Sequence, residues 1–326
     1  MEFWGWYIAI YLFLGGTGAG AYLTSLAADK GLLGDAPQLK RIGYIISGPV
    51  AGFGALLLVM DLGQGIHKPW LLIGLLSNPY SVMTWGTGIL SIFIFLGLAR
   101  GLLAFLSRPS PKWLDYTGAV FAVATGIYTG MLIFAVRAIP FWNNYALPIL
   151  FLISALSSGM SATSILAHFL EKEHSADHRG IIRVHVRLVA GELIVLFIVF
   201  ALIFSGLMGP VAVHSGNLLL YDHFSAVFWI LLVGVGLVGP FIVYIKNPAN
   251  RYIFSRQHED SLDHDLVETH DSQIIKLPGN FYIQKSKSFK TIDYFLLCDL
   301  AVLIGGLSLR CLFIFAALPV WDGRLI

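Results

Sequence analysis

This chain has few charged residues. Asp, Glu, Lys and Arg together make up 12% of its 326 residues, whereas soluble domains carry roughly 25%. Hydrophobic residues make up 57%, and the mean hydropathy is +0.76. This deficit excludes a surface that faces mainly water, so lipid must surround most of the chain. The net charge of +2 and the lack of a basic tail also argue against a nucleic-acid partner.

Cysteine is nearly absent as well. Cys298 and Cys311 lie thirteen residues apart in the last apolar segment, too far for a disulfide within one helix. There is no CxxC motif, so we expect no iron–sulfur cluster held by this chain alone. The ten histidines form no mid-span pair and no compact metal-ligand spacing, which predicts neither a haem nor a metal site.

Long apolar runs, by contrast, occur eight times. A helix needs ~20 apolar residues to cross a hydrocarbon core ~30 Å thick, and the runs of this length are about 4–28, 42–62, 80–106, 115–139, 146–170, 187–208, 224–245 and 294–318. They predict an all-α integral membrane protein with about eight transmembrane helices. We expect a first four-helix bundle over 1–145, holding the candidate site, and a second over 146–326. The seventh connection, about 246–293, is long, polar and charged.

Lys and Arg are distributed unevenly between the connections. Of the 21 in the chain, 16 fall in or beside the odd-numbered connections and 3 on the other side. Cytoplasmic loops carry an excess of these residues, so the odd-numbered connections, including 246–293, are predicted to be cytoplasmic. Both termini are then expected on the outer side of the cytoplasmic (inner) membrane.

This topology places Tyr11, Asp61, Trp85 and Tyr128 at a similar outer depth in the first four spans, with Thr84 beside Trp85. A carboxylate near the lipid core costs ~2.5 kcal/mol or more unless it is paired or hydrated. Asp61 is therefore either a hydrated helix-end acid or a proton acceptor beside a redox-active ligand. A deep tyrosine needs a partner for its hydroxyl, so Tyr128 either bonds a neighbouring backbone carbonyl or donates to the carbonyl of a quinone.

The first span carries the glycine-rich run 15–20. A phosphate-binding loop of this composition follows a strand and opens a helix in water, which this position excludes. Gly16 and Gly20 form a GxxxG pair, and small residues let helix backbones approach closely. The run is interpreted either as a packing face or as a groove that admits a flat ligand ring.

Charged residues also lie within the later spans. Arg187 and Glu192 occupy the sixth span, and Asp299 and Arg310 the eighth. Asp299 and Arg310 are separated by ~16 Å along a helix, so each needs a partner elsewhere. Intramembrane charges are often relay elements, and Arg187, Glu192 and Arg310 are predicted to form a proton route toward the cytoplasm. Structural ion pairs are the alternative.

Four blocks of sequence carry a family likeness. They are residues 6–16 with 18–21, then Asp61-Leu62-Gly63, then Asn78-Pro79 with Ser81, Met83, Trp85 and Gly86, and finally 140–143 with Leu147-Pro148 and 154–159. Together they resemble the NrfD/PsrC family, the membrane subunits of polysulfide reductase and related respiratory complexes. The similarity covers about residues 4–205. Where that family often has Arg-Pro-x-Arg after Asp-Leu-Gly, this chain has residues 64–69, Gln-Gly-Ile-His-Lys-Pro.

The resemblance implies a quinone-reactive membrane anchor without a redox cofactor of its own. Such subunits bind menaquinone or ubiquinone near the outer face. They exchange electrons with a four-cluster, ferredoxin-like iron–sulfur subunit docked there, which serves a catalytic subunit of molybdopterin or multihaem type.

The resemblance also implies roles for individual residues. Tyr128 matches the family's helix-4 tyrosine associated with the quinone carbonyl, and Asp61 matches the helix-2 acid proposed for proton transfer. Tyr11 stands about where polysulfide reductase has a histidine. The expected catalytic residues are Asp61 and Tyr128, and the expected quinone-binding residues are Tyr11, Gly15, Thr84, Trp85 and Tyr128.

Two other functions stay open on the sequence. A secondary transporter would use the buried charges to bind an ion or substrate, although no inverted repeat of the transporter kind is apparent. A purely structural anchor would perform no quinone chemistry. Copurification discriminates between an anchor and a transporter, because an anchor should come with iron–sulfur and catalytic subunits and a transporter alone.

Overall fold

The computed structural model describes residues 5–33, 37–61, 81–170, 178–246, 274–276, 282–284 and 288–319. Eight helices in this part of the chain are long and apolar enough to cross a membrane, which confirms the eight predicted spans. They are α1 (Trp6–Asp29), α2 (Pro37–Asp61), α4 (Val82–Phe105), α5 (Lys112–Phe134), α6 (Leu147–Leu170), α7 (His178–Phe204), the continuous pair η2 (Val227–Val238) and α9 (Gly239–Lys246), and α11 (Ser288–Phe315). Residues 62–80 lie outside the described residues, and with them Leu62, Gly63, Asn78 and Pro79 of the family-like blocks.

Five features of the secondary structure were not expected from the sequence. The 3-10 turn η1 (Pro140–Trp142) and helix α8 (Pro210–Leu220) lie between spans, and η2 has the wider π-helical winding. The strands β1 (Ile274–Lys276) and β2 (Tyr282–Gln284) pair antiparallel. Both fall within the long polar connection predicted over 246–293, most of which lies outside the described residues.

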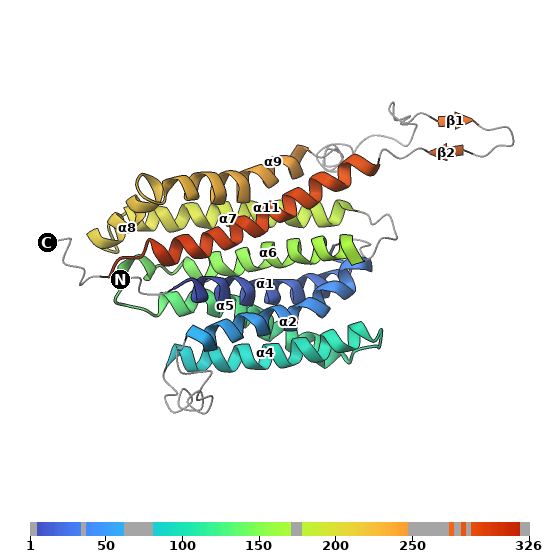
Figure 1. The fold of residues 1–326 in the computed structure, drawn as a ribbon, viewed down its shortest axis with the longest axis horizontal. Coiled ribbons are helices and arrows are strands. Elements are labelled where there is room, and N and C mark those ends of the chain that lie inside the picture. The colour runs from blue at the N-terminus through green and yellow to red at the C-terminus, as the bar shows by residue number, and fades with distance from the viewer. Residues whose placement is uncertain are drawn as a thin grey trace, which may run out of the picture.

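The helices lie side by side, with α1 and α6 inside the bundle (Figure 1). Helix α1 packs against α2, α5, α6 and α11, and α6 packs against α1, α5, α7 and α11. These two helices therefore join the halves 1–145 and 146–326, and the division into two four-helix bundles stays a prediction.

Small residues explain why α1 can sit so deep. A Cβ on Gly18 would lie 2.7 Å from the Ser47 carbonyl oxygen of α2, and one on Gly20 would overlap the Ala155 carbonyl of α6. Only a side chain without a Cβ permits such backbone approach. At these positions the packing interpretation of the glycine run is confirmed.

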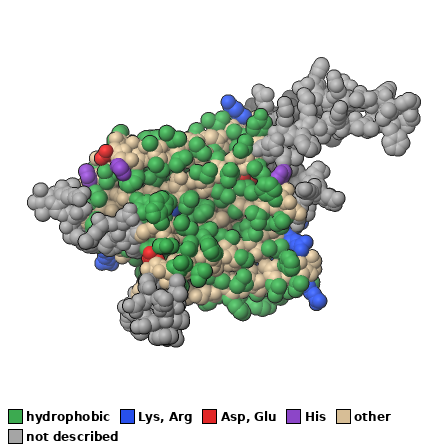
Figure 2. Space-filling view, viewed as in Figure 1, with side chains coloured by type: hydrophobic (Ala, Val, Ile, Leu, Met, Phe, Trp, Pro, Cys, Tyr) green, Lys and Arg blue, Asp and Glu red, His purple; other side chains and the backbone are tan. Residues whose placement is uncertain are grey.

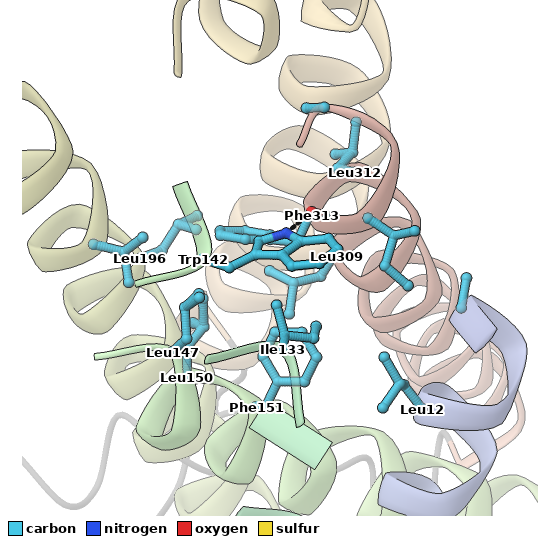
Figure 3. Close-up of a cluster of buried hydrophobic side chains, with 14 of the residues drawn as sticks. Leu12, Ile133, Trp142, Leu147, Leu150, Phe151, Leu196, Leu309, Leu312 and Phe313 are labelled. Atoms are coloured by element: carbon cyan, nitrogen blue, oxygen red, sulfur yellow. Dashed lines mark hydrogen bonds between the residues drawn. The ribbon is translucent and has the colours of Figure 1, made fainter. Parts of the chain in front are cut away.

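Both ends of the described chain lie at one end of the bundle. The rings of Trp6, at the start of α1, and Phe315, at the end of α11, have centroids 4.7 Å apart. We call this the termini end; assigning it to the outer side of the membrane stays a prediction. Near it, Trp142 of η1 is fully buried and donates its indole N–H to the Phe313 carbonyl of α11 at 2.7 Å (Figure 3).

The surface fits lipid. Large apolar side chains point outward along the spans, among them Phe95 of α4 and Phe197 of α7, which are 73% and 75% exposed. Figure 2 shows hydrophobic side chains covering the length of the visible face, with charged ones gathered toward its two ends. The chain is a multi-pass membrane protein.

Candidate functional site

Two buried tyrosines from different helices face each other inside the bundle. Tyr11 of α1 is fully buried and Tyr128 of α5 is 5% exposed. Their hydroxyl groups interact electrostatically with one another, but neither has a hydrogen-bond partner of normal geometry among the described residues. A buried hydroxyl without a partner costs about 1–3 kcal/mol. The backbone-carbonyl alternative considered for Tyr128 is therefore not what the structure shows.

Two glycines adjoin this pair of tyrosines. The ring of Tyr128 lies against the backbone of Gly86 in α4, where any Cβ would overlap the ring atoms Cε2 and Cζ. Gly15 also adjoins the pair, since a Cβ there would come within 3.8 Å of Tyr11 Cε2 and 4.0 Å of Thr129 Cγ2. These are ordinary contact distances, so Gly86 is sterically required whereas Gly15 is not.

A cavity of about 810 Å³ lies at the termini end of the bundle. Its lining includes Val82 of α4 and Met131 of α5, together with Arg137, Asn143 and residues of the α7–α8 connection. Val82 is one helical turn from Gly86, and Met131 is one turn from Tyr128, so each pair shares a helix face. Ligand pockets typically measure 300–1,000 Å³, which makes the cavity large enough for a quinone ring.

The remaining predicted site residues lie at the same end but farther out. Asp61 is the last residue of α2 and is exposed. Leu58, one turn earlier, belongs to the same core cluster as Tyr11 and Tyr128. Trp85 is 67% exposed, and Thr84 is partly buried. The structure thus brings Tyr11, Gly15 and Tyr128 together and leaves Asp61 and Trp85 at the rim.

A second polar cluster joins α6, α7 and α11. Arg310 is fully buried and donates from Nη1 to the Ser154 hydroxyl at 2.6 Å and to the Gly306 carbonyl at 2.7 Å. Glu192, 2% exposed, interacts with both Ser154 and Arg310. Arg187 is exposed and does not join them. Of the three residues expected to form a proton route, two are therefore adjacent.

A third cluster, missed on the sequence, is buried near the opposite end. The Tyr244 hydroxyl of α9 donates to Asp299 Oδ1 of α11 at 3.0 Å and lies 3.0 Å from His185 Nδ1 of α7. His185 Nδ1 is 3.6 Å from the same carboxylate oxygen. Asp299 was expected to need a partner from another helix, and these are its partners. The helical periodicity of apolar residues could have placed His185, Tyr244 and Asp299 each on a buried helix face, but it could not predict that the three contact one another.

A fourth cluster is structural. Arg100 of α4 donates from Nε to Asp115 Oδ1 of α5 at 2.6 Å and from Nη2 to Asp29 Oδ2 of α1 at 3.4 Å. Its guanidinium lies 3.8 Å above the ring of Tyr44. The sequence signal that could have predicted this ion pair is Arg100 inside an apolar run, followed after a short connection by Asp115. Within the described ranges, no group of three or more His, Cys, Asp or Glu residues could hold a metal ion.

Comparison with known proteins agrees with this architecture. The family model described as "Polysulphide reductase, NrfD" matches residues 2–254. The protein is also 29% identical, over 272 residues, to the C subunit of polysulfide reductase from Wolinella succinogenes, an alignment that covers 75% of this sequence and 84% of that subunit. Because the family model spans most of the sequence, this multi-pass membrane protein belongs to the NrfD polysulphide reductase family.

Proposed function

We propose that this protein is the quinone-reactive membrane anchor of a multi-subunit respiratory oxidoreductase. The observation that carries the proposal is the pair of buried hydroxyls of Tyr11 and Tyr128, neither of which has a hydrogen-bond partner of normal geometry in the described part of the chain. Tyr128 is one helical turn from Met131, which lines a cavity of about 810 Å³. A quinone presents carbonyl acceptors that two such donors would satisfy. The family relationship to a subunit of polysulfide reductase supports an oxidoreductase anchor.

Each residue then has a defined task. A bound menaquinone or ubiquinone supplies the two-electron, two-proton chemistry. Tyr128, held against Gly86, and Tyr11 orient the ring through their hydroxyl groups. Trp85 and Thr84 border its entrance. Asp61, exposed at the end of α2, exchanges protons with water, and the Glu192–Arg310 pair extends the proton route toward the opposite end.

The partners follow from the position of the site. We place the termini end on the outer side of the cytoplasmic membrane, since the Lys and Arg distribution favours it. A four-cluster, ferredoxin-like iron–sulfur subunit would dock there and pass electrons to or from a catalytic subunit of molybdopterin or multihaem type. The exposed rim of the cavity, which includes Arg137, would lie under that subunit.

Tyr128→Phe tests the proposal, with Tyr44→Phe as the matched control. Both changes remove a buried hydroxyl that has no hydrogen-bond partner in the described part of the chain, so neither should lower the unfolding temperature. Quinone-linked turnover of the membrane complex should fall about ten-fold in Tyr128→Phe, the effect of losing one hydrogen bond, and stay unchanged in Tyr44→Phe. Equal turnover in the two variants would remove Tyr128 from the mechanism.

Asp61→Asn tests the proton role separately. Asparagine keeps the size of the side chain but cannot accept a proton, so turnover should drop while quinone affinity is retained. The measurement is turnover as a function of pH in the intact complex. Full activity across the pH range would show that Asp61 takes no part in proton exchange.

A further inference from the structure

Four exposed cations surround the turn between α4 and α5, at the end of the bundle opposite the termini. They come from the end of α1, the start of α2, the α4–α5 connection and the start of α5, and none belongs to the proposed quinone site. Figure 2 shows Lys and Arg side chains at this end of the molecule, next to hydrophobic ones. We call the four residues the basic cluster; they are Lys30, Arg41, Arg108 and Lys112.

Two members of the basic cluster are held at the end of α4. Arg41 donates from Nε to the Ala104 carbonyl at 3.0 Å and from Nη2 to the Phe105 carbonyl at 2.9 Å. These bonds use only part of the guanidinium, which has five N–H donors. The Arg108 N–H donates to the Leu103 carbonyl at 2.9 Å and closes the turn that follows α4. Arg41 and Arg108 are therefore fixed close to the same helix end.

The other two members adjoin Tyr116 near the start of α5. The Lys30 ammonium is 4.7 Å from the centroid of the Tyr116 ring. Lys112 comes four residues before Tyr116, one turn away on the same helix face, and the tyrosine hydroxyl interacts electrostatically with both ammonium groups. The dipole of α5 is positive at this end. Lys112 therefore strengthens the positive field instead of balancing it.

The carboxylates nearby are already engaged. Asp29 and Asp115 both bind the buried Arg100, at 3.4 Å and 2.6 Å. Lys30 is attracted by both carboxylates but forms an ion pair with neither within the described residues. Asp35, the other acid in this part of the sequence, lies outside the described residues. Even with Asp35 included, the basic cluster together with Arg100 outnumbers the acids, so an excess of positive charge remains.

An apolar stripe on α4 leads directly to the basic cluster. Phe95, Leu98, Leu102 and Phe105 recur at intervals of three and four residues, so they share one helix face. All four side chains are exposed. The stripe is ~15 Å long and ends at Phe105, whose carbonyl accepts the hydrogen bond from Arg41. A hydrocarbon chain that lies along the stripe therefore brings its head group to the guanidinium.

We propose that the basic cluster and the stripe on α4 form a binding site for an anionic phospholipid. The lipid phosphate accepts hydrogen bonds from Arg41, Arg108 and Lys112, because arginine donors match phosphate oxygens in geometry. Trp113 and Tyr116 are exposed beside it, and such side chains occupy the headgroup level of a bilayer. The proposed orientation places this end on the cytoplasmic side, where anionic lipids attract basic segments. The bound lipid bridges α2, α4 and α5 and takes no part in the quinone reaction.

Quenching of tryptophan emission by brominated lipids tests the proposal. The full-length protein is placed in nanodiscs that contain brominated phosphatidylglycerol or brominated phosphatidylcholine with the same acyl chains. Trp113 directly follows Lys112, and its emission is obtained as the difference between the parent protein and Trp113→Phe. The quenching of this emission by each lipid gives the lipid preference at the site. The other tryptophans among the described residues lie toward the termini end; they are Trp6, Trp85, Trp142 and Trp229.

Arg108→Gln and Lys112→Gln should each lower the preference for phosphatidylglycerol about five-fold, which corresponds to about 1 kcal/mol for each cation. Both side chains are exposed, so the unfolding temperature in phosphatidylcholine should not change. The control is Lys246→Gln, which removes an exposed cation at the same end of the bundle but on α9. It should leave the preference unchanged.

Two results would overturn the proposal. Equal quenching of Trp113 by the two lipids in the parent protein would show that no anionic lipid is selected, and would make an acidic protein surface the better partner for the basic cluster. An equal loss of preference in Lys246→Gln would reduce the effect to the overall charge of the protein. Since neither quinone nor a partner subunit is present, a failure of the proposed quinone site leaves this result unaffected.

Discussion

Gly86→Ala is the change that most directly tests the tyrosine site. The added methyl carbon would overlap Cε2 and Cζ of Tyr128, well inside the ~3.5–4.0 Å at which carbon atoms pack. Either the Tyr128 ring moves by roughly 2 Å or α4 separates from α5. Such overpacking costs about 1–3 kcal/mol, and the better helix propensity of alanine returns about 1 kcal/mol. The expected loss in the free energy of unfolding is therefore small, about 0–2 kcal/mol.

The effect on function should be much larger. A misplacement of about 1 Å can cost 10²-fold in rate, so we expect quinone-linked turnover to fall by about that factor. Gly88→Ala is the control, because Gly88 lies on the same helix and a Cβ there would have no atom within 4 Å. Turnover and quinone affinity would be measured for both variants in the purified complex, together with the unfolding temperature. A Gly86→Ala protein with the turnover and affinity of Gly88→Ala would refute the assignment of Tyr128 as a quinone ligand.

Three further outcomes are expected. Trp142→Phe removes a buried hydrogen bond and should lower the free energy of unfolding by about 1–3 kcal/mol, as measured by thermal unfolding in detergent. Asp115→Asn leaves Arg100, 8% exposed, without its closest charge partner, and should cost about 3–5 kcal/mol in the same measurement. Single cysteines introduced by Leu32→Cys and Tyr145→Cys, at positions 72% and 79% exposed, should react with an impermeant thiol reagent from opposite sides of the membrane, Tyr145→Cys from outside.

Hydropathy predicted the spans well because lipid imposes a length of about 20 residues on every crossing helix. The same topology predicts a similar outer depth for Tyr11 and Tyr128, whose side chains interact in the structure. Hydropathy over a span's length does not report helix winding or short elements between the spans, and for that reason η2, η1 and α8 were not expected.

The arrangement within the site depended on helix rotation, which depth does not determine. Gly86, which has no side chain, lies against the Tyr128 ring. The adjacent residue of a helix is turned about 100° away. Trp85 is accordingly 67% exposed, although its depth is suitable for a ligand contact. The cluster of His185, Tyr244 and Asp299 likewise needs three helices in one register, which no spacing within a single segment reveals.

The glycine-rich packing of α1 has a consequence for how the protein is made. Among the eight spans in the described residues, α1 has the lowest hydropathy, 1.2, and the largest share of buried residues, 78%. It is the helix least suited to lipid, yet it is the first of these eight to leave the ribosome. We therefore expect α1 to remain at the insertion machinery until α2 emerges, so that the two enter the bilayer as a closed hairpin.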